Sequence, residues 1–167
     1  MPCLYRRRPV RVLAQDSGVS VFENYTREQL RRAYTEAWAK HVAHTLLTPL
    51  EALITDVIGA HPEYHGIVAH AETALEFEQN AAAVASAENP FLHMGLHLAV
   101  REQLSIDRPP GIRDLHRQLQ AQLGEAHLAE HALMEALAEE LHVAQRHGQA
   151  PDEVHYLERA RAHLARP

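Results

Sequence analysis

Apolar residues recur at every third or fourth position along most of this chain, and no stretch alternates apolar and polar residues as a half-buried strand does. A repeat of about 3.6 residues places these side chains on one face of a helix, which must then be covered by another helix. The connections between the periodic stretches are short. We therefore predict an all-α fold, a single-domain bundle of about six helices.

Capping and breaking residues indicate where these helices begin and end. Thr26 with Gln29, and Thr48 with Glu51, have the spacing of a capping box, and glycine or proline bounds most of the other helices. Frequent alanine makes the pattern vague between residues 62 and 88. The expected helices cover residues 26–46, 49–59, about 67–80, 90–105 and 111–123, then the stretch between Gly124 and Gly148, and a last one from Pro151.

The length of 167 residues suits one domain with its own core. Residues 1–21 lack apolar periodicity, so we predict a tail there and an all-helical domain over residues 22–165. The single cysteine, Cys3, allows neither a disulfide framework nor a thiolate metal site. No apolar run reaches the ~20 residues that cross a bilayer, and no secretory signal is recognisable. The expected location is therefore the cytoplasm, with no membrane partner.

Charge is distributed unevenly along the chain. Its formal net charge is −6, of which residues 1–21 contribute +3 and the remainder −9. A nucleic-acid-binding domain would present a basic face. The acidic helical domain therefore argues against a nucleic-acid partner.

Histidine is abundant, with 14 residues, and three pairs of histidines are spaced four residues apart. Random placement would give about one such pair in a chain of this composition. On a helix, this spacing puts both imidazoles on one face, one turn apart. One pair stands in the apolar stretch FLHMGLH and another in HLAEHALM, so both should face the core. The pairs are His61/His65, His93/His97 and His127/His131.

These pairs predict a metal site. Histidines and carboxylates on facing helices are how helical bundles bind non-haem iron, zinc or manganese. We therefore expect the chain to bind one or two transition-metal ions (iron, zinc or manganese). A glutamate close to His131 would supply an oxygen ligand or orient an imidazole. The candidate ligands are His61, His65, His93, His97, His127, His131, Glu130 and Glu135.

A second interpretation stays open. Buried histidines often hydrogen-bond a carboxylate or a backbone carbonyl. The chain would then be a non-catalytic interaction or structural protein whose apolar helices form a homodimer. The sequence contains no phosphate-binding glycine loop, no cysteine nucleophile in the helical domain and no spacing typical of a catalytic triad. The residues therefore do not indicate whether the chain is an enzyme.

Three stretches resemble a known family: LTPLEALITDVIGAHPEYH, NPFLHMGLHLAVREQLSIDRPPGIR and HLAEHALMEALAEEL. From about Phe22 to Leu157, the chain is similar to the bacterial family catalogued as domain of unknown function 1841. The family name implies no activity, so no catalytic role follows from the resemblance. All six paired histidines, together with Glu102 and Glu130, lie inside the matching segments.

Overall fold

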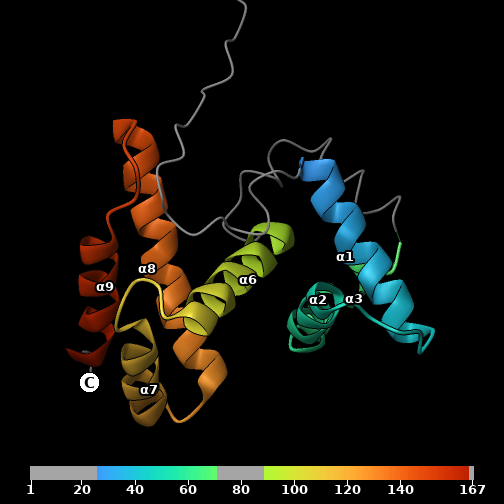
Figure 1. The fold of residues 1–167 in the computed structure, drawn as a ribbon, viewed down its shortest axis with the longest axis horizontal. Coiled ribbons are helices and arrows are strands. Elements are labelled where there is room, and N and C mark those ends of the chain that lie inside the picture. The colour runs from blue at the N-terminus through green and yellow to red at the C-terminus, as the bar shows by residue number, and fades with distance from the viewer. Residues whose placement is uncertain (1–25, 71–88, 166–167) are drawn as a thin grey trace, which may run out of the picture.

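A computed structural model describes residues 26–70 and 89–165 of the chain, which are helical and contain no strand (Figure 1). The predicted all-α fold is thus confirmed for this part of the chain. The described α-helices are α1 (Arg27–Val42), α2 (Pro49–Gly59), α3 (His65–Val68), α6 (Pro90–Ile106), α7 (Ile112–Leu123), α8 (Ala126–His147) and α9 (Glu153–Ala162). Of two short 3-10 helices, η1 (Pro62–Tyr64) directly precedes α3 and η2 (His163–Ala165) directly follows α9. The predicted tail, residues 1–21, and residues 71–80 of the helix expected near 67–80 lie outside the described residues.

Both predicted capping boxes are formed. The Thr26 hydroxyl accepts a hydrogen bond from the Gln29 backbone N–H at 3.2 Å, and the Gln29 side chain accepts one from the Thr26 N–H at 2.7 Å. Thr48 and Glu51 repeat this arrangement at the start of α2. The end of α1 was predicted wrongly: the helix stops at residue 42 rather than 46. His44 adopts a positive φ of 54°, which an α-helix cannot continue through.

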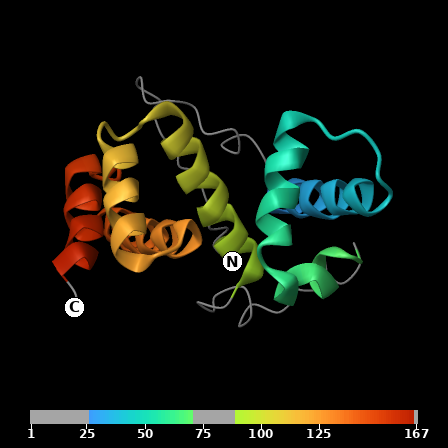
Figure 2. The ribbon, with the colours of Figure 1, turned by 90° about the horizontal axis from the view of Figure 1, so that it is seen from below.

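Two hydrophobic clusters meet on α6. The first packs α1, α2 and α3 against the first half of α6, with buried residues that include Tyr34, Ile54, Ile58, Val68, Met94 and Leu98. The second packs the later part of α6 against α7, α8 and α9, with buried residues that include Val100, Ile112, Leu119, Leu133 and Leu157. Figure 2 shows α6 between these two groups of helices. The apolar stretch around residues 91–97 therefore forms the central helix that its sequence predicted.

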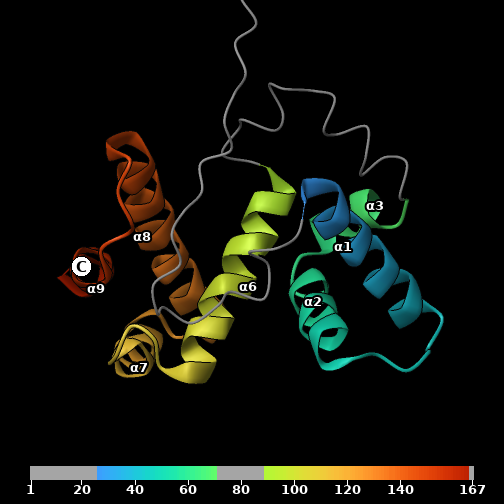
Figure 3. The ribbon, with the colours of Figure 1, turned by 45° about the horizontal axis from the view of Figure 1, so that its top comes forward.

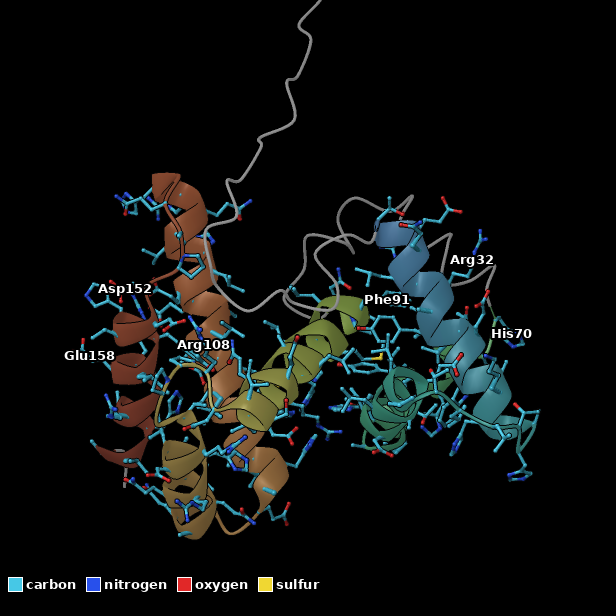
Figure 4. The ribbon with its side chains drawn as sticks, viewed as in Figure 1. Arg32, His70, Phe91, Arg108, Asp152 and Glu158 are labelled. Atoms are coloured by element: carbon cyan, nitrogen blue, oxygen red, sulfur yellow. The ribbon has the colours of Figure 1, made fainter. Side chains whose placement is uncertain are left out.

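The first turn of α6 is anchored to α1 by an aromatic contact. Phe91 projects into the space between α6 and α1 (Figure 4), with its ring centroid 6.0 Å from that of Tyr34. The Arg31 guanidinium lies 5.0 Å from the centre of the same Phe91 ring, which is a cation–π contact. This anchor fixes the part of α6 that carries His93 and His97.

The order of the helices in space decides which side chains can meet. In Figures 1 and 3, α6 lies between α2 and α8. Because α6 separates these two helices, their side chains can meet only past the edge of α6. No helix within the described ranges is long and apolar enough to cross a membrane.

Candidate metal centre

Five imidazole rings gather where the end of α2, the first half of α6 and the start of α8 meet. Most of the ring pairs have centroids 4.3–5.0 Å apart. The exception among the neighbouring pairs is His61 with His131, at 6.0 Å. The five residues are His61, from the turn after α2, His93 and His97, from α6, and His127 and His131, from α8. We call this group the histidine cluster.

The orientation of His61 is set by the backbone of α2. Its Nδ1 lies 2.8 Å from the carbonyl oxygen of Val57. Because a carbonyl can only accept, Nδ1 carries the proton and Nε2 keeps its lone pair. Nε2 points into the cluster and lies 3.0 Å from Nε2 of His93. The turn after α2 therefore presents the lone pair of a nitrogen, a potential metal ligand, to α6.

Four of the rings bring donor atoms close enough to bind one ion. Each of His61, His93, His97 and His131 offers a nitrogen, and these nitrogens lie within 4.8 Å of one another. Nε2 of His131 lies 3.0 Å from Nε2 of His97, the same separation as between the His61 and His93 nitrogens. Two neighbouring nitrogens on one ion stand about 3.0–3.4 Å apart, since each bond is about 2.0–2.1 Å long. The observed spacing therefore suits a shared ion.

Burial lowers the pKa of three of these imidazoles, those of His93, His97 and His131. His61 and His97 are buried, with exposed fractions of 3% and 0%. Burial, and then the neighbouring imidazoles, lowers the pKa of His93 to about 4 and that of His131 to about 4. Burial is also the largest cause that lowers the pKa of His97. Neutral imidazole is the form that binds metal, so these three rings are in their binding form at neutral pH.

Glu130 orients the His97 ring through a hydrogen bond to its Nδ1 atom. Its Oε2 accepts a hydrogen bond from Nδ1 of His97 at 2.9 Å, and Nε of Arg101 donates to both of its oxygens at 3.1 and 3.2 Å. Burial alone would raise the pKa of Glu130, but the hydrogen bonds from His97 and Arg101 and the charge of Arg101 outweigh it, so the pKa is lowered. The ionised carboxylate holds the proton of His97 on Nδ1. The lone pair of Nε2 therefore points into the cluster, where it can bind a metal ion. Metal-binding histidines commonly have such a carboxylate partner.

Two of the candidate ligands lie apart from the cluster. Nε2 of His65 lies 3.0 Å from the carbonyl oxygen of Ile58, and its ring packs on Trp38 at 4.4 Å. Because the chain turns through η1 between His61 and His65, their spacing is not one turn of a continuous helix. Glu135 has a side chain that is 65% exposed and lies 3.9 Å from His163. It is one turn, about 6 Å, farther along α8 than His131, the nearer of the two paired histidines there.

Two further residues at the cluster were not predicted from the sequence. Arg101 follows His97 by four residues on α6, a spacing that could have indicated a contact with the same carboxylate. Tyr64 stacks on His61, with centroids 5.4 Å apart and planes inclined by 8°. No sequence pattern marks that contact, because it depends on the turn through η1.

Comparison with known proteins gives one match. Residues 26–162 match the family described as "Domain of unknown function (DUF1841)", a range that includes the whole histidine cluster. No curated protein and no solved structure matches the chain. The comparisons therefore supply no activity, and the chemistry of the cluster has to be argued from its geometry.

Proposed function

This chain belongs to the family described as "Domain of unknown function (DUF1841)", and on that premise we propose that its histidine cluster binds a transition-metal ion. The resemblance predicted from the sequence is confirmed by the family match. One observation carries the proposal: four imidazoles from three separate segments place their donor nitrogens within 4.8 Å of one another. The proposed ligands are His61, His93, His97 and His131.

The protonation of the rings supports a cation at this point. In His61 the carbonyl of Val57 fixes the proton on Nδ1, and in His97 the carboxylate of Glu130 does the same. Both rings therefore direct an Nε2 lone pair into the cluster, each 3.0 Å from the Nε2 atom of another histidine. In a buried site each of these lone pairs needs a partner, either the N–H of the facing imidazole or a cation. One metal ion would satisfy all four nitrogens at once.

The donor set narrows the choice among iron, zinc and manganese. All four proposed ligands are neutral nitrogen donors, while the nearest carboxylate, that of Glu130, is engaged by His97 and Arg101. Imidazole suits zinc and iron, whereas manganese favours oxygen ligands. We therefore propose zinc or ferrous iron. Such an ion would supply Lewis-acid chemistry or, in the case of iron, redox chemistry, while the four imidazoles hold it.

Metal uptake tests this function directly. Protein stripped with a chelator would be titrated with Zn²⁺, and with Fe²⁺ under anaerobic conditions, followed by elemental analysis and thermal unfolding. We expect the melting temperature to rise with metal concentration, since a ligand of the native state stabilises it by mass action. The double variant His93→Ala/His131→Ala should lose this response. His142→Ala, which alters an exposed histidine on α8, should keep it.

The alternative function, a non-catalytic interaction or structural protein with satisfied core histidines, makes the opposite prediction. The stripped protein would take up no metal, or the double variant would respond to metal as the unaltered protein does. Either result would overturn the metal-binding proposal. A homodimer and a cytoplasmic location stay predictions from the sequence.

A further inference from the structure

His127 and Glu130 belong to a second group of metal-binding side chains that shares only His97 with the first group. In each group, the donor atoms lie within 4.8 Å of one another. We propose that this second group binds a second transition-metal ion beside the first. This inference rests on the proposed function, because it requires the first ion to bind.

One ion cannot use both groups as they stand. When an ion binds, its donors lie no farther apart than twice the bond length, about 4.2 Å, so donors spread over as much as 4.8 Å must draw together slightly. His127 and Glu130 fall outside the set of nitrogens that lie within 4.8 Å of one another around the first position. They are therefore too far from some of those nitrogens to complete the same coordination sphere.

The shared imidazole points to two positions. Nε2 of His97 faces His131 at 3.0 Å, whereas Nδ1 faces Oε2 of Glu130 at 2.9 Å. The lone pairs of the two nitrogens of one imidazole diverge, so they cannot bind the same ion. Glu130, on the Nδ1 side of His97, therefore serves a separate position.

His127 supplies the third donor of this second group, within 4.8 Å of donor atoms of His97 and Glu130. Its ring lies 4.3 Å from that of His131, and 5.0 Å from that of His97, to which it is inclined by only 12°. Within the described residues, no hydrogen bond engages either nitrogen of His127, whereas the other four rings of the cluster each have a partner at 2.8–3.0 Å. The cluster thus contains a fifth imidazole that is not among the proposed ligands of the first ion.

Binding at the second position has a chemical cost, which determines its affinity relative to the first position. For His97 to offer Nδ1 to a second ion while Nε2 holds the first, the proton on Nδ1 would have to pass to solvent. Glu130 exchanges its hydrogen bond from His97 for a bond to the ion, while Arg101 stays on the same carboxylate. The positive charge of Arg101 and of the first ion opposes a second cation. The second ion should therefore bind more weakly than the first.

The number of Zn²⁺ ions bound per chain tests the inference. Calorimetric titration of the stripped full-length protein with Zn²⁺ should show a tight step followed by a weaker one, with two ions bound at saturation. His127→Ala should bind a single ion, with the affinity of the tight step changed by less than about threefold. His142→Ala should still bind two, because that side chain is exposed and lies farther along α8.

Each result has a distinct meaning. One ion in the unaltered protein, or a second ion retained at the same affinity in His127→Ala, would overturn this inference and leave the proposed function intact. No ion at all would overturn the proposed function as well. Circular dichroism of each variant would establish that its helices have formed, so that a lost step reports on binding.

Discussion

Glu130 accepts a hydrogen bond from Nδ1 of His97 at 2.9 Å across the interface between α8 and α6. The His97 side chain is completely buried, and a polar group in such a position is costly unless it is hydrogen-bonded. Arg101, from the next turn of α6, holds the carboxylate in place from its other side. This relationship determines which nitrogen of His97 faces the other imidazoles.

The first prediction concerns this carboxylate. Glu130→Gln should weaken the tight metal site by about 10–100-fold, the usual effect of removing the partner of a metal-binding histidine. The amide is a weaker acceptor for His97 and no longer pairs with the Arg101 guanidinium. Competition against a chromophoric chelator would measure the affinity.

The matched control for that substitution is Glu135→Gln, on the same helix. The Glu135 side chain is 65% exposed and lies away from the histidine cluster, so the affinity should stay within about twofold. Equal losses in the two variants would show that the effect is one of general charge, and an unchanged affinity in Glu130→Gln would show that the carboxylate does not position His97.

The second prediction concerns the stability of the metal-free protein in acid. Burial, and then the neighbouring imidazoles, lowers the pKa of His93 to about 4 and that of His131 to about 4, from about 6.5 in an unfolded chain. Between these values the unfolded chain binds more protons than the native one. The contribution of these two histidines to the free energy of unfolding is therefore complete above about pH 6.5, and it is lost progressively as the pH falls towards about 4.

Urea unfolding at a series of pH values, with chelator present, would measure this loss. His93→Gln should make the free energy of unfolding less dependent on pH. His142→Gln should leave this pH dependence unchanged, because that histidine is exposed. A free energy of unfolding that stays level between about pH 7 and pH 5 would show that the cluster accepts protons without cost.

The third prediction concerns the core of α6. Leu98 is completely buried in the cluster formed with α1, α2 and α3, so Leu98→Ala should lower the free energy of unfolding by about 2–5 kcal/mol. Leu92 is 52% exposed on the same helix, and Leu92→Ala should cost less than about 0.5 kcal/mol. Chemical unfolding would measure both values, and similar costs would contradict the central position of this helix.

Helix starts were predictable from the sequence because they depend on local contacts. Each capping box uses a side chain and a backbone group only three residues apart, so the sequence alone indicates Thr26 and Thr48. The end of α1 was missed because no glycine or proline marks it. A change to positive φ at His44, which residue types alone rarely indicate, follows the end of this helix.

The candidate site was predictable only where the histidines lie on regular helices. On α6 and α8, a spacing of four residues correctly placed each pair on one face, as for His93 and His97. His65 follows the 3-10 turn of η1, and the same spacing there does not put two rings together. Which pairs meet one another depends on how the helices pack, and the sequence pattern does not contain that information.

The last prediction follows from where a metal ion would sit in the fold. The end of α2 belongs to one hydrophobic cluster and α8 to the other, and α6 is the helix shared by both. An ion bound to His61 and His131 would join these two groups of helices directly. Hydrogen exchange of the stripped and metal-loaded protein would measure this, and amides in the last turn of α2 should exchange more slowly when metal is bound. Amides of α7 and α9, which pack on α8 away from the site, should change much less. His61→Ala should abolish the difference at α2, because that residue is the proposed ligand from this side of the cluster. Equal slowing in α2, α7 and α9 would mean that the ion stabilises the molecule only as a whole, without holding the first group of helices against the second.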